Sequence, residues 1–307
     1  MNLLFDLIAT QPKSEFSYHG GSEYAKAVFN GLMKYKNSNS VKIYCLIDNT
    51  LHLNKTIRNK AEDSEFKLID INKYNNFKEI LTLHKITRFY SALLLDLVNQ
   101  YSLEVKDVEL IFTIHGLRGM ELPWDTYESK YLSKIREYLR FFYKKYFTSV
   151  YLNKARKKVN DITQKVEKYK IITVSNHSKY SILNFFPNLE YKDIKVFYSP
   201  IQKYSIKEEN PLDLSSFNVK NKKFFVIISS AIWTKNSYRL IKAFDQLIKN
   251  HHDFDYKLLV LGYNLKRKFK VSNKSHIIFR DYQDRETLEY LLRNAFALIY
   301  PTLNEGF

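Results

Sequence analysis

The sequence predicts an α/β protein with two domains, each built on a parallel sheet. Short, β-rich apolar runs alternate with longer amphipathic segments, and this alternation is typical of parallel strands that are connected by helices. The chain has 307 residues, which is enough for two domains of about 150 residues. The segment 203–223 is polar, contains Pro211 and has little periodicity. We therefore predict domains at 1–202 and 224–307, joined by a linker at 203–223.

The elements follow in order along the chain. Helical periodicity is clearest at 25–32, in the segment after Asn236 and in the segment that Asp284 would cap. The strands are expected at 2–8, 41–47, 66–71, 108–114, 169–174 and 193–198 in the first domain, and at 224–230, 256–261 and 296–300 in the second.

The scarce residue types exclude several classes of protein. Cys45 is the single cysteine, so an intrachain disulfide and a cysteine-rich zinc site are excluded. The seven glycines form neither a GxGxxG fingerprint nor a Walker A loop, and the histidines form no HExxH motif. No apolar run approaches the ~18 residues that span a bilayer, and the first residues lack the features of a signal peptide. We expect a cytoplasmic protein, with peripheral attachment to the inner face of the membrane as an option.

The charge points to an anionic partner. The formal net charge is +17, so nucleic acid, an acidic membrane surface and phosphorylated substrates all stay open. The most basic stretch is 127–168, in which Tyr and Phe alternate with Lys and Arg. One interpretation is a long solvated helix whose aromatic stripe packs on a sheet, which is the usual role of a charge run. The other is a surface that binds anionic lipid or an anionic acceptor.

Two candidate loops lie in the first domain. Gly20 and Gly21 follow the first strand and precede a helix, where small residues and free N–H groups favour a bound phosphate. A tight turn would explain the glycine pair equally well. His115 ends the strand 108–114 and begins a glycine-containing loop, where it could bind a ligand or hold a loop carbonyl.

Two further loops lie in the second domain. Lys235 and Asn236 stand between the strand 224–230 and the next helix, so the Lys235 charge could hold a diphosphate. Glu305 and Gly306 follow the strand 296–300, where a carboxylate could bind sugar hydroxyls. Asp253 and Asp255 form an Asp-x-Asp that could chelate a metal, but it precedes a strand instead of following one, so it is better explained as a turn.

These four loops together resemble the retaining GT-B glycosyltransferases of family 4 type (glycosyl transferases group 1). The most specific match is the segment 300–307, Tyr-Pro-Thr-Leu-Asn-Glu-Gly-Phe, which is similar to the start of the family's Glu-x7-Glu motif. The resemblance implies two facing Rossmann-like domains and catalytic roles for His115, Lys235 and Glu305. It also implies that the donor is bound by Gly20, Gly21, Lys235, Asn236, Glu305, Gly306 and Phe307.

Two departures from the family pattern matter. Ser230 stands where the family commonly has an Arg, five residues before the lysine. The second Glu of the motif would lie eight residues after Glu305, so we expect the second domain to be incomplete and the chain truncated within this motif.

The resemblance implies transfer of a sugar from a UDP- or GDP-sugar to a glycan or lipid-linked acceptor, in polysaccharide assembly. It implies no metal and no cofactor, and no nucleic-acid partner. Two alternatives stay open: a catalytically silent relative that binds a nucleotide-sugar or glycan, which Ser230 suggests, and a nucleic-acid-binding protein, which the charge suggests.

Overall fold

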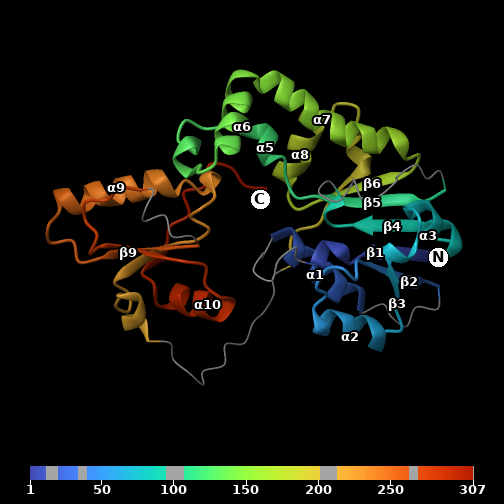
Figure 1. The fold of residues 1–307 in the computed structure, drawn as a ribbon, viewed down its shortest axis with the longest axis horizontal. Coiled ribbons are helices and arrows are strands. Elements are labelled where there is room, and N and C mark those ends of the chain that lie inside the picture. Colours follow the sequence, from blue (N-terminus) through green and yellow to red (C-terminus); the bar gives the residue numbers. More distant parts are fainter. Residues whose placement is uncertain (12–19, 34–39, 95–106, 201–212, 263–268, 307) are drawn as a thin grey trace. The chain divides into compact units, whose positions relative to one another are not determined.

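The computed structural model divides into two compact units (Figure 1). It describes residues 1–11, 20–33, 40–94, 107–200, 213–262 and 269–306. The first unit comprises Met1–Met120, Leu152–Gln202 and Gly306–Phe307, and the second comprises Glu121–Tyr151 and Lys203–Glu305. Residues 203–212 of the predicted linker lie outside the described residues.

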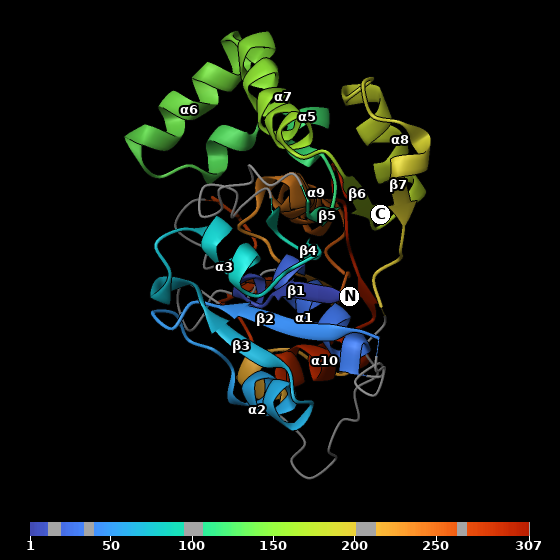
Figure 2. The ribbon, with the colours of Figure 1, turned by 90° about the vertical axis from the view of Figure 1, so that its right-hand side faces the viewer.

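The first unit is built on a seven-stranded parallel sheet (Figure 2). Its order is β3-β2-β1-β4-β5-β6-β7, so β2 and β3 lie on one side of β1 and the strands from β4 onward lie on the other. The strand order therefore reverses between β1 and β4. Ligands of open parallel sheets bind at the carboxyl ends of the strands beside such a reversal. The strands are β1 (Asn2–Asp6), β2 (Lys42–Ile47), β3 (Lys67–Asp70), β4 (Arg88–Ser91), β5 (Glu109–Ile114), β6 (Tyr169–Thr173) and β7 (Ile194–Val196).

The second unit has a four-stranded parallel sheet in the order β10-β9-β8-β11. Here β8 lies between β9 and β11, and Phe225 pairs with Leu258 on one side and with Ala297 on the other. The strands are β8 (Phe224–Ile227), β9 (Lys257–Leu261), β10 (Ile277–Arg280) and β11 (Ala297–Leu298).

Helices connect the strands in both units. The helices are α1 (Gly20–Leu32), α2 (Lys55–Asp63), α3 (Phe77–Leu83), α5 (Arg118–Glu121), α6 (Ile135–Tyr146), α7 (Thr148–Lys165), α8 (Asn176–Phe185), α9 (Ser237–Asn250) and α10 (Arg285–Asn294), with short 3-10 turns that include η5 (Glu128–Tyr131) and η8 (Trp233–Lys235). Asp284 caps α10 through the Thr287 N–H, as its position in the sequence predicts. Among the described residues, no helix has the length and apolar composition needed to cross a membrane.

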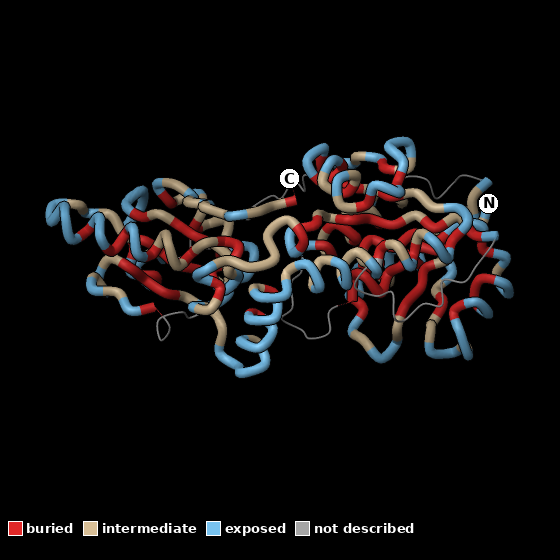
Figure 3. The backbone as a smooth tube through the Cα atoms, turned by 90° about the horizontal axis from the view of Figure 1, so that it is seen from above, coloured by how far each residue is buried: buried red, intermediate tan, exposed pale blue. Residues whose placement is uncertain are grey.

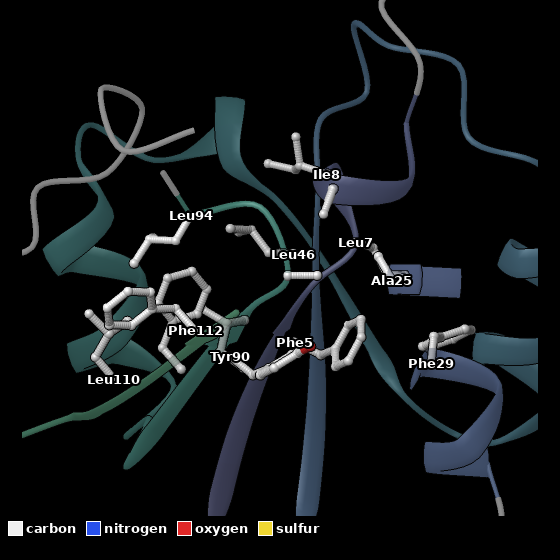
Figure 4. Packing of buried hydrophobic residues seen from close by; sticks show 14 of the residues in the cluster. Phe5, Leu7, Ile8, Ala25, Phe29, Leu46, Tyr90, Leu94, Leu110 and Phe112 are labelled. Atoms are coloured by element: carbon white, nitrogen blue, oxygen red, sulfur yellow. The ribbon is translucent and has the colours of Figure 1, made fainter. Parts of the chain in front are cut away.

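The core of the first unit lies on both faces of its sheet. Consecutive residues Leu4 and Phe5 of β1 are both fully buried, which requires cover on each face. Phe5 packs against Phe29 of α1 and against Tyr90 of β4 (Figure 4). The strands are largely buried along their length (Figure 3). Because the packing holds the strands in place, the loops that follow their carboxyl ends begin at fixed positions.

The structure differs from the sequence-based prediction in two strands and one long helix. The sequence-based prediction did not include β4 and β10. The stretch 127–168 is not one helix: it forms η5, α6 and α7, and the chain leaves helical geometry at Phe147. Several of its aromatic side chains, among them Phe142 and Tyr146, are exposed and do not pack on a sheet.

Candidate functional site

Two of the predicted site residues, Lys235 and Glu305, are in contact in the second unit. Lys235 is the last residue of η8, which follows β8, and it is buried. Glu305 follows β11, and its carboxylate forms an ion pair with the Lys235 ammonium. Since β8 and β11 are neighbouring parallel strands, the segments that leave their carboxyl ends meet at one edge of the sheet. The topology thus joins residues that are 70 positions apart.

The Glu305 carboxylate is the centre of a four-residue network. The Thr302 hydroxyl donates to Glu305 Oε1 at 2.8 Å, and the Tyr300 hydroxyl donates to the same oxygen at 2.9 Å. The Lys235 ammonium also donates to the Tyr300 hydroxyl and lies 4.6 Å from the centroid of its ring. Burial raises the pKa of Glu305, but the hydrogen bonds from these three side chains and the Lys235 charge outweigh it and hold the pKa below its ordinary value. The site therefore holds an ionised carboxylate beside a cation at neutral pH.

Three hydrogen bonds hold the Glu305 loop in place. Leu303 N–H donates to the Thr234 carbonyl at 2.8 Å, and the Thr302 hydroxyl donates to the same carbonyl at 3.1 Å. The Asn304 amide donates to Glu121 Oε2 at 2.7 Å. Two segments of the second unit, η8 and the residues around Glu121, thus fix the position of the loop that presents Glu305.

The start of α9 is occupied by side chains of the same unit. Asn236 adopts a left-handed conformation, with φ of 59°, and its side-chain oxygen accepts from Arg239 at 2.9 Å. The Tyr238 N–H, in the first turn of α9, donates to the Tyr131 hydroxyl at 2.7 Å. A ligand that used this N–H would have to displace Tyr131, so the sequence-based idea of a diphosphate at this helix start would require a local rearrangement.

Ser230, at the position where the resembled family has an Arg, is fully buried. Its N–H donates to the Leu261 carbonyl at 3.1 Å and its carbonyl accepts from Ser237 Oγ at 2.6 Å. Its hydroxyl oxygen has no hydrogen-bond partner in the described part of the chain. The position is therefore packed inside the unit by neighbouring backbone, and its side chain adds no charge to the site.

In the first unit, Gly20 and Gly21 lie within α1 and not in the loop before it. They are the first two residues of that helix, so the prediction of a helix starting at 25 was late by about one turn. In the described part of the chain, apart from its chain neighbours and the backbone of its own helix, no atom lies within 4 Å of the position that a Cβ of Gly20 would occupy. Residues 17–19 of the predicted loop lie outside the described residues. An anion site at the start of this helix stays a prediction.

His115 directly follows β5, at the strand end where the sequence predicts it. Its Nε2 lies 3.0 Å from the Ala92 carbonyl oxygen, and since a carbonyl only accepts, Nε2 carries the proton. The imidazole meets the Tyr24 ring edge to face, with centroids 4.8 Å apart. Tyr24 belongs to α1, so the helix that begins with Gly20 and Gly21 also orients His115.

Gly306 belongs to the first unit and packs beside His115 and Gly116. Its carbonyl accepts hydrogen bonds from Ser175 Oγ and Ser178 Oγ, each at 2.5 Å. A Cβ at Gly306 would collide with the His115 carbonyl oxygen, and a Cβ at Gly116 would lie 3.0 Å from the Gly306 Cα. Only glycine fits this approach without a backbone shift. Phe307, also predicted to bind the donor, lies outside the described residues.

Sequence reasoning missed several residues that build these two sites. Tyr300 and Thr302 lie inside the quoted 300–307 segment, so their spacing to Glu305 was a usable signal. Tyr131 and Ser178 contact the sites from distant parts of the sequence, and no local pattern marks them. Asp253 and Asp255 lie between α9 and β9, and Asp255 pairs with Lys223 at 3.6 Å.

Comparisons with known proteins bear on the second unit and on the fold. Residues 212–307 match the family model described as Glycosyl transferases group 1. A search of curated protein sequences finds no match. Among solved structures, WaaG, described as a glycosyltransferase involved in lipopolysaccharide biosynthesis, is 14% identical with a TM-score of 0.53, over 99% of this chain and 76% of that chain.

Two further structures are informative about the extent of the match. An α,α-trehalose-phosphate synthase (UDP-forming) from Burkholderia vietnamiensis is 9% identical with a TM-score of 0.53, over 100% of this chain and 78% of that one. TarM is 14% identical with a TM-score of 0.40, and the chain spans 40% of its length. The predicted fold class, α/β with parallel sheets of the GT-B type, is confirmed. The chain therefore carries, over residues 212–307, a region of the glycosyl transferases group 1 type within a fold that it shares with GT-B glycosyltransferases.

Proposed function

We propose that the chain acts in sugar transfer, moving a sugar from a UDP- or GDP-sugar to a glycan or lipid-linked acceptor with retention of configuration and without a metal. The observation that carries this proposal is the contact between Lys235 and Glu305 within the region that matches the glycosyl transferases group 1 family. A buried cation beside an ionised carboxylate suits a donor with an anionic diphosphate and a neutral, hydroxyl-rich sugar.

The proposed mechanism separates the two partners of the ion pair. Donor binding would place the diphosphate against the Lys235 ammonium, which offsets the charge that builds on the leaving group in the transition state. Glu305, released from Lys235, would accept hydrogen bonds from sugar hydroxyls, and its lowered pKa keeps it in the accepting, ionised form. In this scheme Tyr300 and Thr302 hold the carboxylate while its partner changes.

The residues of the first unit take the roles that the family resemblance assigns. The N–H groups at Gly20 and Gly21 would meet the diphosphate, and His115 would contact the transferred sugar. Gly306 and Phe307 would also bind the donor, and Asn236 of the second unit would do so beside Lys235. The choice of UDP is favoured by the trehalose-phosphate synthase, whose name states that it forms UDP. A glycan acceptor is favoured by WaaG, which is described as acting in lipopolysaccharide biosynthesis.

The test is nucleotide binding by calorimetry, followed by consumption of UDP- and GDP-sugars. Lys235→Ala should weaken UDP binding and raise the activation free energy of transfer by about 2–4 kcal/mol, because it removes the charge that stabilises the leaving diphosphate. Lys249→Ala is the matched control, since Lys249 is an exposed lysine in the last turn of α9. Unchanged UDP affinity in a folded Lys235→Ala protein would mean that the diphosphate binds elsewhere.

A catalytically silent relative is the second candidate, and the burial of Ser230 favours it. Ser230 brings no cation to the site, so in this proposal the charge that faces the diphosphate in the second unit comes from Lys235. The two functions differ in one measurement: a silent relative binds the nucleotide-sugar but leaves it intact in the presence of acceptor, whereas an enzyme releases the nucleotide.

A further inference from the structure

Helix α6 (labelled in Figure 2) buries only two of its residues and exposes a row of apolar side chains. Its buried residues are Phe141 and Lys144, and Lys144 forms a buried ion pair with Glu128 of η5. The Lys144 ammonium also lies 5.5 Å from the centroid of the Trp233 ring. These contacts determine which side of α6 faces the second unit, because a buried ion pair cannot be turned toward solvent without losing its partners.

The opposite side of α6 carries a continuous apolar stripe. Its members are Ile135, Leu139, Phe142 and Tyr146, at the spacing i, i+4, i+7 and i+11. At about 100° per residue these four side chains lie within about 60° of one another around the helix. Their exposed fractions are 80%, 65%, 45% and 67%, and the rings of Phe142 and Tyr146 stack with centroids 6.1 Å apart. Soluble proteins turn such a stripe toward their core.

Basic side chains flank this stripe on both sides. Arg136 and Arg140 follow Ile135 and Leu139 by one position, while Lys134 and Lys145 precede Ile135 and Tyr146 by one position. Between Lys134 and Val150 the sequence has five basic residues and a single acidic one, Glu137. The Glu137 carboxylate accepts hydrogen bonds from the N–H groups of Ser133 and Lys134, at the first turn of the helix. The stripe is therefore bordered by positive charge.

We propose that α6 is a membrane-docking helix, which lies in the surface of an anionic phospholipid bilayer with its apolar stripe inserted and its flanking arginines and lysines against lipid phosphates. An apolar stripe of Ile, Leu and aromatic residues between rows of Lys and Arg is the composition of interfacial helices. The arginine side chains are long enough to reach phosphates while their aliphatic stems cover the stripe. Each basic residue near an anionic surface adds about one order of magnitude or less to the binding constant.

The charge also argues against a second copy of the chain as the occupant. The spacing of the stripe is that of paired helices, in which flanking charges of opposite sign normally face each other. Two copies of α6 would instead bring rows of like charge together, on chains that each carry a net charge of +17. An anionic lipid surface offers the complementary charge.

The test is sedimentation of the full chain with vesicles of equal parts phosphatidylcholine and phosphatidylglycerol, compared with phosphatidylcholine alone. Binding should require the anionic lipid and should be reversed as NaCl rises from ~50 to ~500 mM. Leu139→Ser is paired with Leu83→Ser, because Leu83 of α3 is 64% exposed and Leu139 is 65% exposed. A double variant removes two charges beside the stripe, Arg136→Glu with Arg140→Glu. Its control is Lys55→Glu with Lys78→Glu, at two exposed lysines of the first unit, so both proteins have the same net charge.

The two α6 variants should lose about tenfold or more in binding, and their controls should change by about twofold or less. If a variant does not fold, a fluorescent label gives a second test. Cys45 is buried, so a thiol-reactive fluorophore should label the new cysteine of Leu139→Cys or Leu83→Cys. Insertion of α6 should shift the emission of the label at position 139 to shorter wavelength and leave the label at position 83 unchanged. Equal binding to neutral vesicles, or equal losses in the α6 variants and their controls, would overturn the proposal. So would a wild-type dimer that ignores vesicles and dissociates in Leu139→Ser.

Discussion

Replacing Lys235 with Met should destabilise the second unit even without a ligand. Met keeps the length of the side chain but removes the ammonium, which donates to both Glu305 and Tyr300 and is buried. Glu305 then stays in a partly buried place without its cation. The hydroxyls of Tyr300 and Thr302 still donate to it, at 2.9 and 2.8 Å.

The size of the effect follows from this geometry. Breaking a buried ion pair from one side costs about 3–5 kcal/mol when the other charge is left uncompensated. Here two hydroxyl donors still satisfy the carboxylate and 19% of the Glu305 side chain is exposed, so the loss should be smaller. We expect a loss of about 2 kcal/mol in the free energy of unfolding, near the value of one hydrogen bond to a charged group.

A double-mutant cycle isolates the pair from the other effects of each substitution. Glu305→Gln in the Lys235→Met background removes the unpaired charge, so the double variant should be less destabilised than the sum of the two single variants, by about 1–2 kcal/mol. The assay is urea unfolding followed by tryptophan fluorescence. Both tryptophans of the chain, Trp124 and Trp233, belong to the second unit, so the signal reports that unit.

Two outcomes would refute the reasoning. Strict additivity of the two substitutions would show that the ion pair has no coupling energy and that the contact is incidental. A change below about 0.5 kcal/mol for Lys235→Met would show that the ammonium is solvated in the folded protein, as exposed ion pairs are. Lys220→Met, at an exposed lysine of the second unit, is the control for the loss of one positive charge.

The remaining predictions concern pH and the start of α9. Because the pKa of Glu305 is lowered in the folded state, its contribution to stability is present above its unfolded pKa and is lost as the pH falls through the folded value. Glu305→Gln should therefore reduce the loss of stability below about pH 5, measured by urea unfolding at each pH. Some loss should remain in this variant, because the pKa values of Asp125 and Asp245 are also lowered. A pH dependence equal to that of the wild type would contradict the prediction. Tyr131→Phe removes the acceptor of the Tyr238 N–H and should lower the free energy of unfolding of the second unit by about 1 kcal/mol. An unchanged free energy of unfolding would contradict this prediction.

Most of the fold follows from local sequence patterns. Strands such as β1 and β5 are apolar runs whose consecutive residues are buried, and such runs are recognisable from composition alone. Their neighbours in the sheet are harder to predict, since pairing of β8 with β11 depends on contacts across about 70 residues. The Lys235–Glu305 contact could be predicted only through the resemblance to a family, because nothing in either local segment specifies the other.

The segment 121–151 marks the limit of sequence reasoning about domains. It lies within the predicted first domain and shares the basic stretch 127–168 with residues of the first unit, yet it belongs to the second unit. Its contacts with the rest of that unit include Arg239 with Asp125 at 2.9 Å, Tyr131 with Ser237 at 3.1 Å, and Lys144 over Trp233. Single polar pairs of this kind leave no periodic trace in a sequence.

The orientation of α6 shows why periodicity alone is insufficient. The sequence establishes that Ile135, Leu139, Phe142 and Tyr146 share a helical face, and the usual inference places that face inward. The opposite face is the buried one, because Lys144 there meets a buried partner, Glu128, sixteen residues earlier. A hydrophobic pattern thus identifies the two faces of a helix, but the partners available to its polar residues decide which face is inside. Where the apolar face is left outside and bordered by cations, the free energy that would have stabilised a core is available for binding a surface of opposite charge.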